Sequence, residues 1–361
     1  MTGSQGIADD GGGQRVTRVV VRAPNWLGDI VMAMPAIAAV RAAYPGAHLA
    51  VAAPAPFADV CAAMPGIDGV VPLSGSGIRA IGAHAEALKA GGFDLAILFT
   101  NSFASALAAS RAGIAERWGY NRDWRGRLLT QAVPTRPGRK GSAATPAGPH
   151  HSAYYLRLTS SLGMPPVDAP IVLRVPAAAH DRAAALLAEA GVPTDATVVG
   201  FAPGAAYGSA KRWPPERVAE AIGGVVRQGG RAVLVGAASD REIARAIQAV
   251  LAPAVRPFVV DLIGATDTAT LMGALARCRV VVANDSGAMH VASAVGRPVV
   301  AIFGPTDERA TAPQGPHTLV RHEVFCRPCL LRACPIDHRC LRGVGAADVV
   351  AAISAYWTPT S

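Results

Sequence analysis

The chain alternates short β-branched runs with alanine-rich segments of helical length, and this alternation constrains the fold more than any other feature. Strand-like runs in the first half are VTRVVVRA (16–23), HLAVAAP (48–54) and FDLAILF (93–99). Those in the second half are TVVGFAP (197–203), RAVLVGA (231–237), FVVDLIG (258–264), RVVVAND (279–285) and RPVVAIFGP (297–305). Strand–helix alternation is typical of parallel sheets covered by helices on both faces. We therefore predict two α/β domains facing across a cleft, with ligands beyond the carboxyl ends of the strands.

The length of 361 residues favours two domains of ordinary size. We predict a disordered leader over residues 1–14, an N-terminal domain over 15–175 and a C-terminal domain over 176–361. A helix is expected from His151 to Leu162, and the proline-rich link that follows it marks the boundary. Whether the last helix packs back on the N-terminal domain is left open.

The composition indicates a globular protein, because hydrophobic residues make up 51% of the chain and charged ones 16%. The net charge of +9 favours anionic partners such as nucleic acid, nucleotides, phosphorylated sugars or a membrane face, although an arginine-rich proteome alone would give the same excess. No apolar run is long enough for a spanning helix, and the acidic, glycine-rich N-terminus does not read as a signal peptide. We therefore expect a cytoplasmic protein.

One strand-end loop, GFAPGAAYGSAKRWPP (200–215), joins a strand to a helix through small residues and prolines. Small residues let backbone amides approach an anion closely, and Lys211 and Arg212 come just before the helix. The loop reads either as a phosphate site or as a plain turn with solvated basic residues.

A second loop lies within NDSGAMHVASAVG (284–296), where Asp285 or Ser286 is expected to cap a helix that Gly296 closes. The free amides at such a helix start would bind a diphosphate, and Asp285 could accept from sugar hydroxyls. The alternatives are simple capping for Asp285 and a half-buried, satisfied side chain for His290.

The third loop, PNWLGDIVMAMPAI (24–37), places Asp29 at the start of a helix expected to run to Tyr44. Helix dipoles stabilise carboxylates at this position. Pro35 is unusual inside a helix because it removes a backbone hydrogen bond. Asp29 reads either as an N-cap or as a general base that faces the cleft.

Together these stretches resemble the heptosyltransferases of lipopolysaccharide core assembly, which form glycosyltransferase family nine. The resemblance is carried by RAPNWLGDIVMAMPAI, GFAPGAAYGSAKRWP, GAASDREIARAI and NDSGAMHVASAVGRPVVAIFGPT, supported by HHSAYYLRL (150–158). It implies a glycosyltransferase B fold of two Rossmann-like domains, with the acceptor on the first, the ADP-sugar on the second, and catalysis without metal. By this resemblance, Asp29 is the catalytic base, and donor binding falls to Lys211, Asp285, Ser286, Gly287, His290 and Thr306.

The implied reaction is inverting transfer of heptose from ADP-L-glycero-D-manno-heptose to the heptosyl-Kdo inner core of lipopolysaccharide. The implied partners are ADP-heptose, a lipid A–Kdo–heptose acceptor and the anionic inner face of the inner membrane, where the protein would bind peripherally; nucleic acid is not among them. An acceptor hydroxyl would attack the anomeric carbon while one carboxylate takes its proton. The alternatives are transfer to another core position, a sugar-nucleotide epimerase of the same fold, and a non-catalytic nucleotide- or lipopolysaccharide-binding protein.

The segment 121–149 breaks the strand–helix rhythm, and we expect a long loop there. It is strongly basic, with Arg122, Arg125, Arg127, Arg136, Arg139 and Lys140 against the single acid Asp123. Arg122, Arg125 and Arg127 are candidates for acceptor binding and for docking on the inner leaflet. A disordered, solvated loop is the alternative.

Four of the six cysteines fall within CRPCLLRACPIDHRC, namely Cys326, Cys329, Cys334 and Cys340, with His338 among them. The first spacing suits zinc or an iron–sulfur cluster, but the second pair does not repeat it. The cluster reads either as a structural metal site, which transfer would not need, or as reduced thiols.

Overall fold

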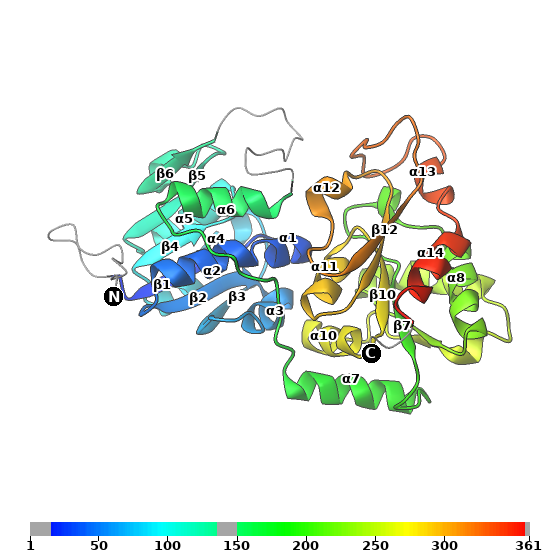
Figure 1. The fold of residues 1–361 in the computed structure, drawn as a ribbon. Helices are drawn as coiled ribbons and strands as arrows, with labels where there is room; N and C mark the ends of the chain where they lie inside the picture. Colours follow the sequence, from blue (N-terminus) through cyan, green and yellow to red (C-terminus); the bar gives the residue numbers. More distant parts are fainter. Residues whose placement is uncertain (1–15, 136–149, 358–361) are drawn as a thin grey trace, which may run out of the picture. The chain divides into compact units, whose positions relative to one another are not determined.

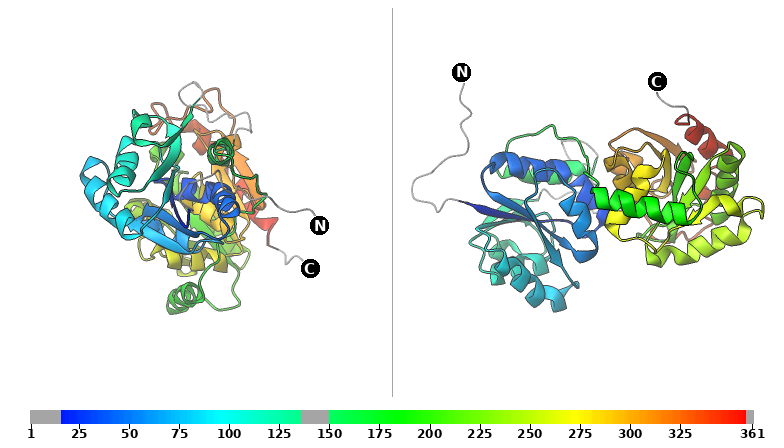
Figure 2. Two further views of the ribbon diagram at one scale, coloured as in Figure 1. Left: turned by 90° about the vertical axis from the view of Figure 1, so that its left-hand side faces the viewer. Right: turned by 90° about the horizontal axis from the view of Figure 1, so that it is seen from below.

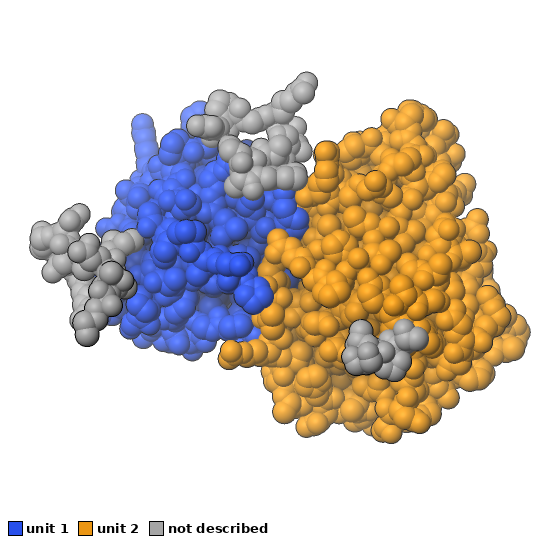
Figure 3. All heavy atoms as spheres, in the orientation of Figure 1, with its two compact units in different colours: residues 1–170 blue, residues 171–361 orange. Residues whose placement is uncertain are grey.

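The computed structural model describes residues 16–135 and 150–357. The predicted leader, residues 1–14, lies outside the described residues. The chain divides into two compact units, residues 1–170 and 171–361 (Figure 3). The division falls after Pro170, within the proline-rich segment.

Unit 1 is a six-stranded sheet in the order β3-β2-β1-β4-β5-β6, and each strand pairs parallel to its neighbours (Figure 1). Its strands are β1 (Arg18–Arg22), β2 (His48–Pro54), β3 (Gly69–Leu73), β4 (Leu95–Leu98), β5 (Glu116–Asn121) and β6 (Gln131–Pro134). Its helices are α1 (Leu27–Met32), α2 (Met34–Ala43), α3 (Ala58–Ala62), α4 (Ile81–Ala90), α5 (Phe103–Arg111) and α6 (Ser152–Ser161). Helix α2 packs on α6, and α4 packs on α5.

Unit 2 has the same strand order, since its parallel sheet runs β12-β11-β10-β7-β8-β9. Its strands are β7 (Val198–Ala202), β8 (Arg231–Leu234), β9 (Val259–Asp261), β10 (Val280–Asn284), β11 (Val299–Phe303) and β12 (His317–Arg321). Its helices are α7 (Ala177–Glu189), α8 (Pro215–Arg227), α9 (Arg241–Val250), α10 (Thr268–Arg277), α11 (Gly287–Ala294), α12 (Glu308–Thr311), α13 (Arg339–Arg342) and α14 (Ala346–Ser354). Figures 1 and 2 show helices on both faces of each sheet. The predicted α/β architecture with two parallel, Rossmann-like sheets is confirmed.

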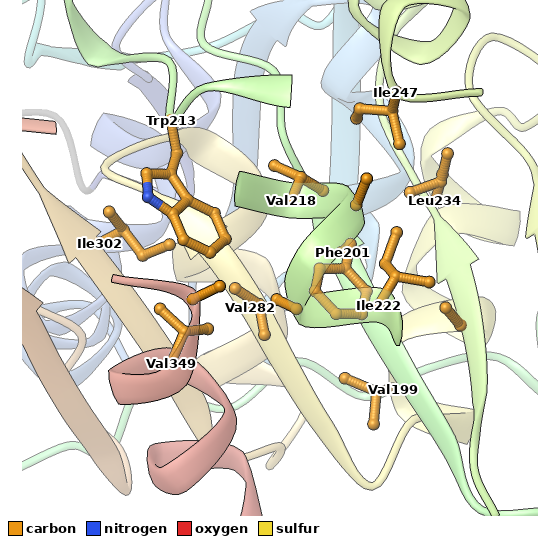
Figure 4. Packing of buried hydrophobic residues seen from close by; sticks show 14 of the residues in the cluster. Val199, Phe201, Trp213, Val218, Ile222, Leu234, Ile247, Val282, Ile302 and Val349 are labelled. Atoms are coloured by element: carbon orange, nitrogen blue, oxygen red, sulfur yellow. The ribbon is translucent and has the colours of Figure 1, made fainter. Parts of the chain in front are cut away.

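The central strands are continuous apolar runs because helices cover them on both sides. In unit 2, one face of the sheet packs Phe201 and Val282 against α8, α9 and α14, and the side chain of Trp213 belongs to the same core (Figure 4). The indole Nε1 of Trp213 donates to the carbonyl oxygen of Val344, 3.1 Å away. This bond fixes the residue that follows the loop bearing Lys211 and Arg212. Helix α14 packs on α8, β10, β11 and β12; its predicted packing on the N-terminal domain stays a prediction.

The order of strands reverses between β1 and β4 in unit 1 and between β7 and β10 in unit 2. In open α/β sheets this reversal separates the connecting loops and leaves room for a ligand beyond the carboxyl ends. The loops after β1, β7 and β10 are the three loops singled out above. The architecture therefore brings each of them to a position where such sheets bind ligands.

Two details of the fold differ from expectation. The segment 121–149 is not a plain loop, because residues 131–134 form β6 and pair with β5. Residues 136–149, including Arg136, Arg139 and Lys140, lie outside the described part of the chain. The helix expected from Asp29 to Tyr44 is two helices, α1 and α2, with Pro35 in the first turn of the second, where a proline fits.

Within the described ranges, no helix has both the length and the apolar character needed to span a bilayer.

Candidate active site

Asp29 lies in the first turn of α1, immediately beyond the central strand β1. The N-cap of this helix is Trp26, which makes no side-chain capping bond, so Asp29 is not the cap. Its side chain is 28% exposed. A carboxylate in the first turn is stabilised in its ionised form by the helix amides. Asp29 therefore combines negative charge with access to solvent.

His151, which precedes α6, is the neighbour of Asp29 that we did not assign from the sequence. Its Nε2 lies 3.7 Å from Asp29 Oδ1 and 3.3 Å from the hydroxyl of Tyr155. Burial, followed by the charge of Asp29, raises the pKa of Tyr155 well above its ordinary value, so this tyrosine stays neutral. The sequence pattern marked His151 only through its place in HHSAYYLRL, because its contact with Asp29 depends on the packing of α6 on α2.

The adjacent strand β4 adds unsatisfied polar groups to the same edge of the sheet. Asn101 Nδ2 donates to the hydroxyl of Tyr154 at 2.7 Å. Thr100 Oγ1 and Asn101 Oδ1 are buried and have no hydrogen-bond partner among the described residues. Buried polar groups without partners are costly, so such atoms point to a polar ligand or to water.

The three arginines proposed for acceptor binding do not share one environment. Arg122 and Arg127 are exposed, on either side of Trp124, whose exposure is 97%. Arg125 is fully buried. It donates to the carbonyl oxygens of Tyr120 and Thr100, and burial lowers the pKa of its guanidinium to about 10, which keeps it protonated at neutral pH. These two bonds hold the turn onto the sheet, while Arg125 Nη2 is buried without a hydrogen-bond partner among the described residues, so the assignment of Arg125 to acceptor binding stays a prediction.

Three of the predicted donor-site residues meet in unit 2. Lys211 follows β7, Asp285 follows β10 and Thr306 follows β11. Lys211 Nζ donates to Asp285 Oδ2 at 2.6 Å, and Thr306 Oγ1 donates to the same oxygen at 2.7 Å. The side chains of Lys211 and Asp285 are only 12% and 5% exposed. Asp285 is thus the partner of a lysine and not a helix cap, and its Oδ1 accepts no bond from the described residues.

Helix α11 begins next to this cluster, at Gly287, with Ser286 as its N-cap. Ser286 makes no capping bond, and its Oγ is buried without a partner in the described part of the chain. The first amides of the helix therefore donate no hydrogen bond to the cap side chain and can bind an anion. His290 lies on α11 and is buried.

Three of the four clustered cysteines, Cys326, Cys329 and Cys334, lie in the segment that links β12 to α13, and Cys340 lies within α13. All have free thiols, and the backbone amide of His338 donates to Cys334 Sγ at 3.3 Å. Burial, then the neighbouring thiols of Cys326, Cys329 and Cys334, raise the pKa of Cys340. Across residues 16–135 and 150–357, no three His, Cys, Asp or Glu side chains are grouped to hold a metal ion. The structure thus gives the zinc or iron–sulfur interpretation no support.

Comparisons with known proteins agree with this geometry. Residues 81–339 match the family model described as glycosyltransferase family 9 (heptosyltransferase). Lipopolysaccharide heptosyltransferase 2 of Salmonella typhimurium is 31% identical over 304 residues, covering 82% of this chain and 85% of that protein. The same-named protein of Escherichia coli K12 is also 31% identical, over 307 residues with the same coverage. The solved structure of the E. coli ADP-heptose LPS heptosyltransferase II superposes with a TM-score of 0.78 at 27% identity, covering 94% of this chain and 98% of that one.

Two parallel sheets that each reverse their strand order, a carboxylate beyond β1 and the matches above lead to one assignment. The chain belongs to glycosyltransferase family 9, the heptosyltransferases, and is a glycosyltransferase with the B fold.

Proposed function

We propose that the chain is the second heptosyltransferase of lipopolysaccharide core assembly. It moves heptose from ADP-L-glycero-D-manno-heptose to a lipid A–Kdo–heptose acceptor with inversion at the anomeric carbon. The relatives that support this proposal carry the name lipopolysaccharide heptosyltransferase 2 and match over 85% of their length. The observation that carries the chemistry is the partly exposed carboxylate of Asp29 beyond β1, with His151 beside it.

In the proposed reaction, the N-terminal domain, predicted over residues 15–175, binds the acceptor, and the C-terminal domain, predicted over 176–361, binds the sugar nucleotide. Asp29 accepts the proton of the attacking hydroxyl as the new glycosidic bond forms. We propose that His151, whose Nε2 lies 3.7 Å from Asp29 Oδ1, orients this carboxylate toward the acceptor hydroxyl. The unsatisfied oxygens of Thr100 and Asn101 bind acceptor hydroxyls at the same edge of the sheet.

ADP leaves as an anion, so its departure needs positive potential rather than a second acid. Lys211 and the first amides of α11, at Ser286 and Gly287, supply that potential. Asp285 and Thr306 hold the lysine in place, because both Lys211 and Thr306 bond to Oδ2 of Asp285. Asp285 Oδ1 then accepts a hydrogen bond from a hydroxyl of the sugar nucleotide. His290 supports α11, whose first amides face the diphosphate.

Exposed Arg122 and Arg127, with Trp124 between them, supply the contact with phosphorylated inner core and with the anionic inner face of the membrane. Arginines favour phosphate, and tryptophan favours the interface between water and lipid. For the cysteine segment we propose reduced thiols rather than a metal site, because no group of three ligands forms among the described residues. We also propose that transfer needs no cofactor, because Lys211 and the first amides of α11 offer positive potential to the leaving diphosphate.

The decisive test is transfer of radiolabelled heptose to two acceptors, one without heptose and one with a single heptose on Kdo. We expect labelling of the second acceptor alone, and an unchanged rate in EDTA. Labelling of the heptose-free acceptor alone would assign the enzyme to another core position. Binding of ADP-heptose without transfer to either acceptor would identify a binding protein, and loss of the rate in EDTA with recovery in magnesium would overturn the metal-free reaction.

A further inference from the structure

The cysteine-rich segment packs against both loops that carry the donor-site residues of unit 2. The hydroxyl of Tyr207 donates to the carbonyl oxygen of Leu330 at 2.8 Å. The amide of Leu330 donates to the carbonyl oxygen of Pro305 at 2.9 Å. The amide of Ala210 donates to the carbonyl oxygen of Arg332 at 3.1 Å. Residues 330–332 are therefore tied to the loop before Lys211 and to the loop before Thr306.

Gly208 shows how close this approach is. Its φ is +156°, and a Cβ atom at this position would lie 2.2 Å from the carbonyl oxygen of Arg332. Only glycine allows the backbone of the segment to come this near the Lys211 loop. The position of Arg332 is thus fixed by contacts of its own main chain.

The basic side chains around the donor site are mostly neutralised by carboxylates. The ion pairs are Lys211–Asp285 at 2.6 Å, Arg212–Asp240 at 3.9 Å, Arg309–Asp307 at 2.7 Å and Arg327–Glu308 at 2.8 Å. A pair of opposite charges exerts only a weak field on a third group. These paired residues therefore attract a diphosphate much less strongly than the same number of unpaired cations would.

Arg332 differs from all of them. It is exposed, and no carboxylate among the described residues lies within ion-pair distance of it. Its Cζ is 5.2 Å from the centre of the Tyr207 ring, while Lys211 Nζ is 4.7 Å from the centre of the same ring. Two cations around one ring repel each other, and an anion bound beside the ring would relieve that repulsion.

We propose that Arg332 is a second cation for the diphosphate of the sugar-nucleotide donor, and that the cysteine-rich segment serves to deliver it beside Lys211. The inference rests on the proposed function, since it takes the Lys211 loop as the donor's phosphate site. It assigns the segment a part in donor binding that requires no metal.

The test is a calorimetric titration of the full-length protein with ADP and with AMP. Arg332→Ala should weaken ADP binding about tenfold, which is the effect of losing one charge-assisted hydrogen bond. AMP should lose less, because it has one phosphate. Arg332→Lys should recover part of the loss, and the remaining affinity of Arg332→Ala should depend less on salt.

The matched control is Arg339→Ala. Arg339 is exposed, lies in the same segment and is paired with Asp337 at 3.0 Å, so its loss should leave ADP affinity within twofold of wild type. ADP affinity of Arg332→Ala equal to that of wild type would overturn the inference while leaving the proposed function intact. Equal losses of ADP and AMP affinity would also overturn it, because they would indicate a distorted loop. A wild-type protein that binds neither ADP nor ADP-heptose would instead overturn the proposed function itself.

Discussion

Asp29 of unit 1 and Asp285 of unit 2 both follow a strand at the point where their sheet reverses its order, yet their surroundings are opposite. Asp29 is 28% exposed, and the imidazole of His151 is 3.7 Å away. Asp285 is 5% exposed, and it receives bonds from Lys211 and Thr306 on one oxygen. The same fold thus keeps one carboxylate partly exposed to solvent and uses the other to hold a cation.

The sharpest way to break this comparison is to neutralise each acid in turn. Asp29→Asn keeps size and polarity but removes the base, so kcat should fall by roughly 10²–10⁴ while ADP affinity and Tm stay near wild type. Asp285→Asn should instead lower both Tm and ADP affinity. Nearly full turnover in Asp29→Asn would retire the base assignment, and unchanged stability in Asp285→Asn would remove the contrast.

The next largest effect concerns the buried ion pair. Lys211→Ala leaves the carboxylate of Asp285 buried without its cation, which should cost about 3–5 kcal/mol of unfolding free energy as well as ADP affinity. Adding Asp285→Asn to this variant should restore part of the stability but none of the affinity, because the lost cation is not replaced. Denaturant unfolding and ADP titration measure the two quantities. Additive losses of stability in the double variant would show that the pair is not coupled.

A smaller effect is expected at His151. His151→Ala should lower kcat about tenfold and leave KM for ADP-heptose unchanged, because the imidazole orients Asp29 and does not bind the donor. His151→Gln keeps a side-chain donor and should recover part of the rate. A purely structural histidine would change Tm in both variants without this split between kcat and KM.

The smallest effect is expected at Asp267, an acid that does cap a helix and so can be compared with Asp29 and Asp285. Asp267 accepts from the amide of Thr270 at 2.6 Å at the start of α10. Hydrogen bonds from Thr270 hold the pKa of this carboxyl below its ordinary value. Asp267→Ala should cost about 1 kcal/mol without changing kcat.

The pH dependence of this cap has a definite sign. A lowered pKa in the folded state means that the stabilisation is complete above the ordinary aspartate pKa and is lost as the pH falls through the folded value. The difference in unfolding free energy between wild type and Asp267→Ala should therefore shrink in acid. A difference that stayed constant from neutral pH to the acid limit would contradict the capping role.

The sequence predicted best the features whose cause is local. Buried parallel strands appear as continuous apolar runs, so the central strands and the loops after them, with Asp29, Lys211 and Asp285, were found in the right places. The strands that were missed include three at or near sheet edges: β3, which contains Pro72, β6 and β12. Edge strands tolerate proline and polar residues, which weakens their pattern.

The environments of side chains depend on distant segments and could not be predicted in this way. Arg125 looked like one of several loop arginines, and only carbonyl oxygens from two neighbouring strand ends explain its burial. His151 meets Asp29 because α6 packs on α2, more than a hundred residues away in the chain. The pairing of Lys211 with Asp285 likewise joins loops 74 positions apart.

The shortness of the helix that carries Asp29 has a consequence for how this enzyme can evolve. Helix α1 has six residues, too few to be stable by its own hydrogen bonds, and Ile30, Val31 and Met32 anchor it in the core. Core substitutions around α1 therefore move the carboxylate as well as loosen the packing. A mutational scan can score each variant separately for cellular abundance and for heptose transfer. Substitutions at positions 30–32 should reduce heptose transfer more than they reduce abundance. Selection would then act on these core residues for the position of Asp29 and not for stability alone.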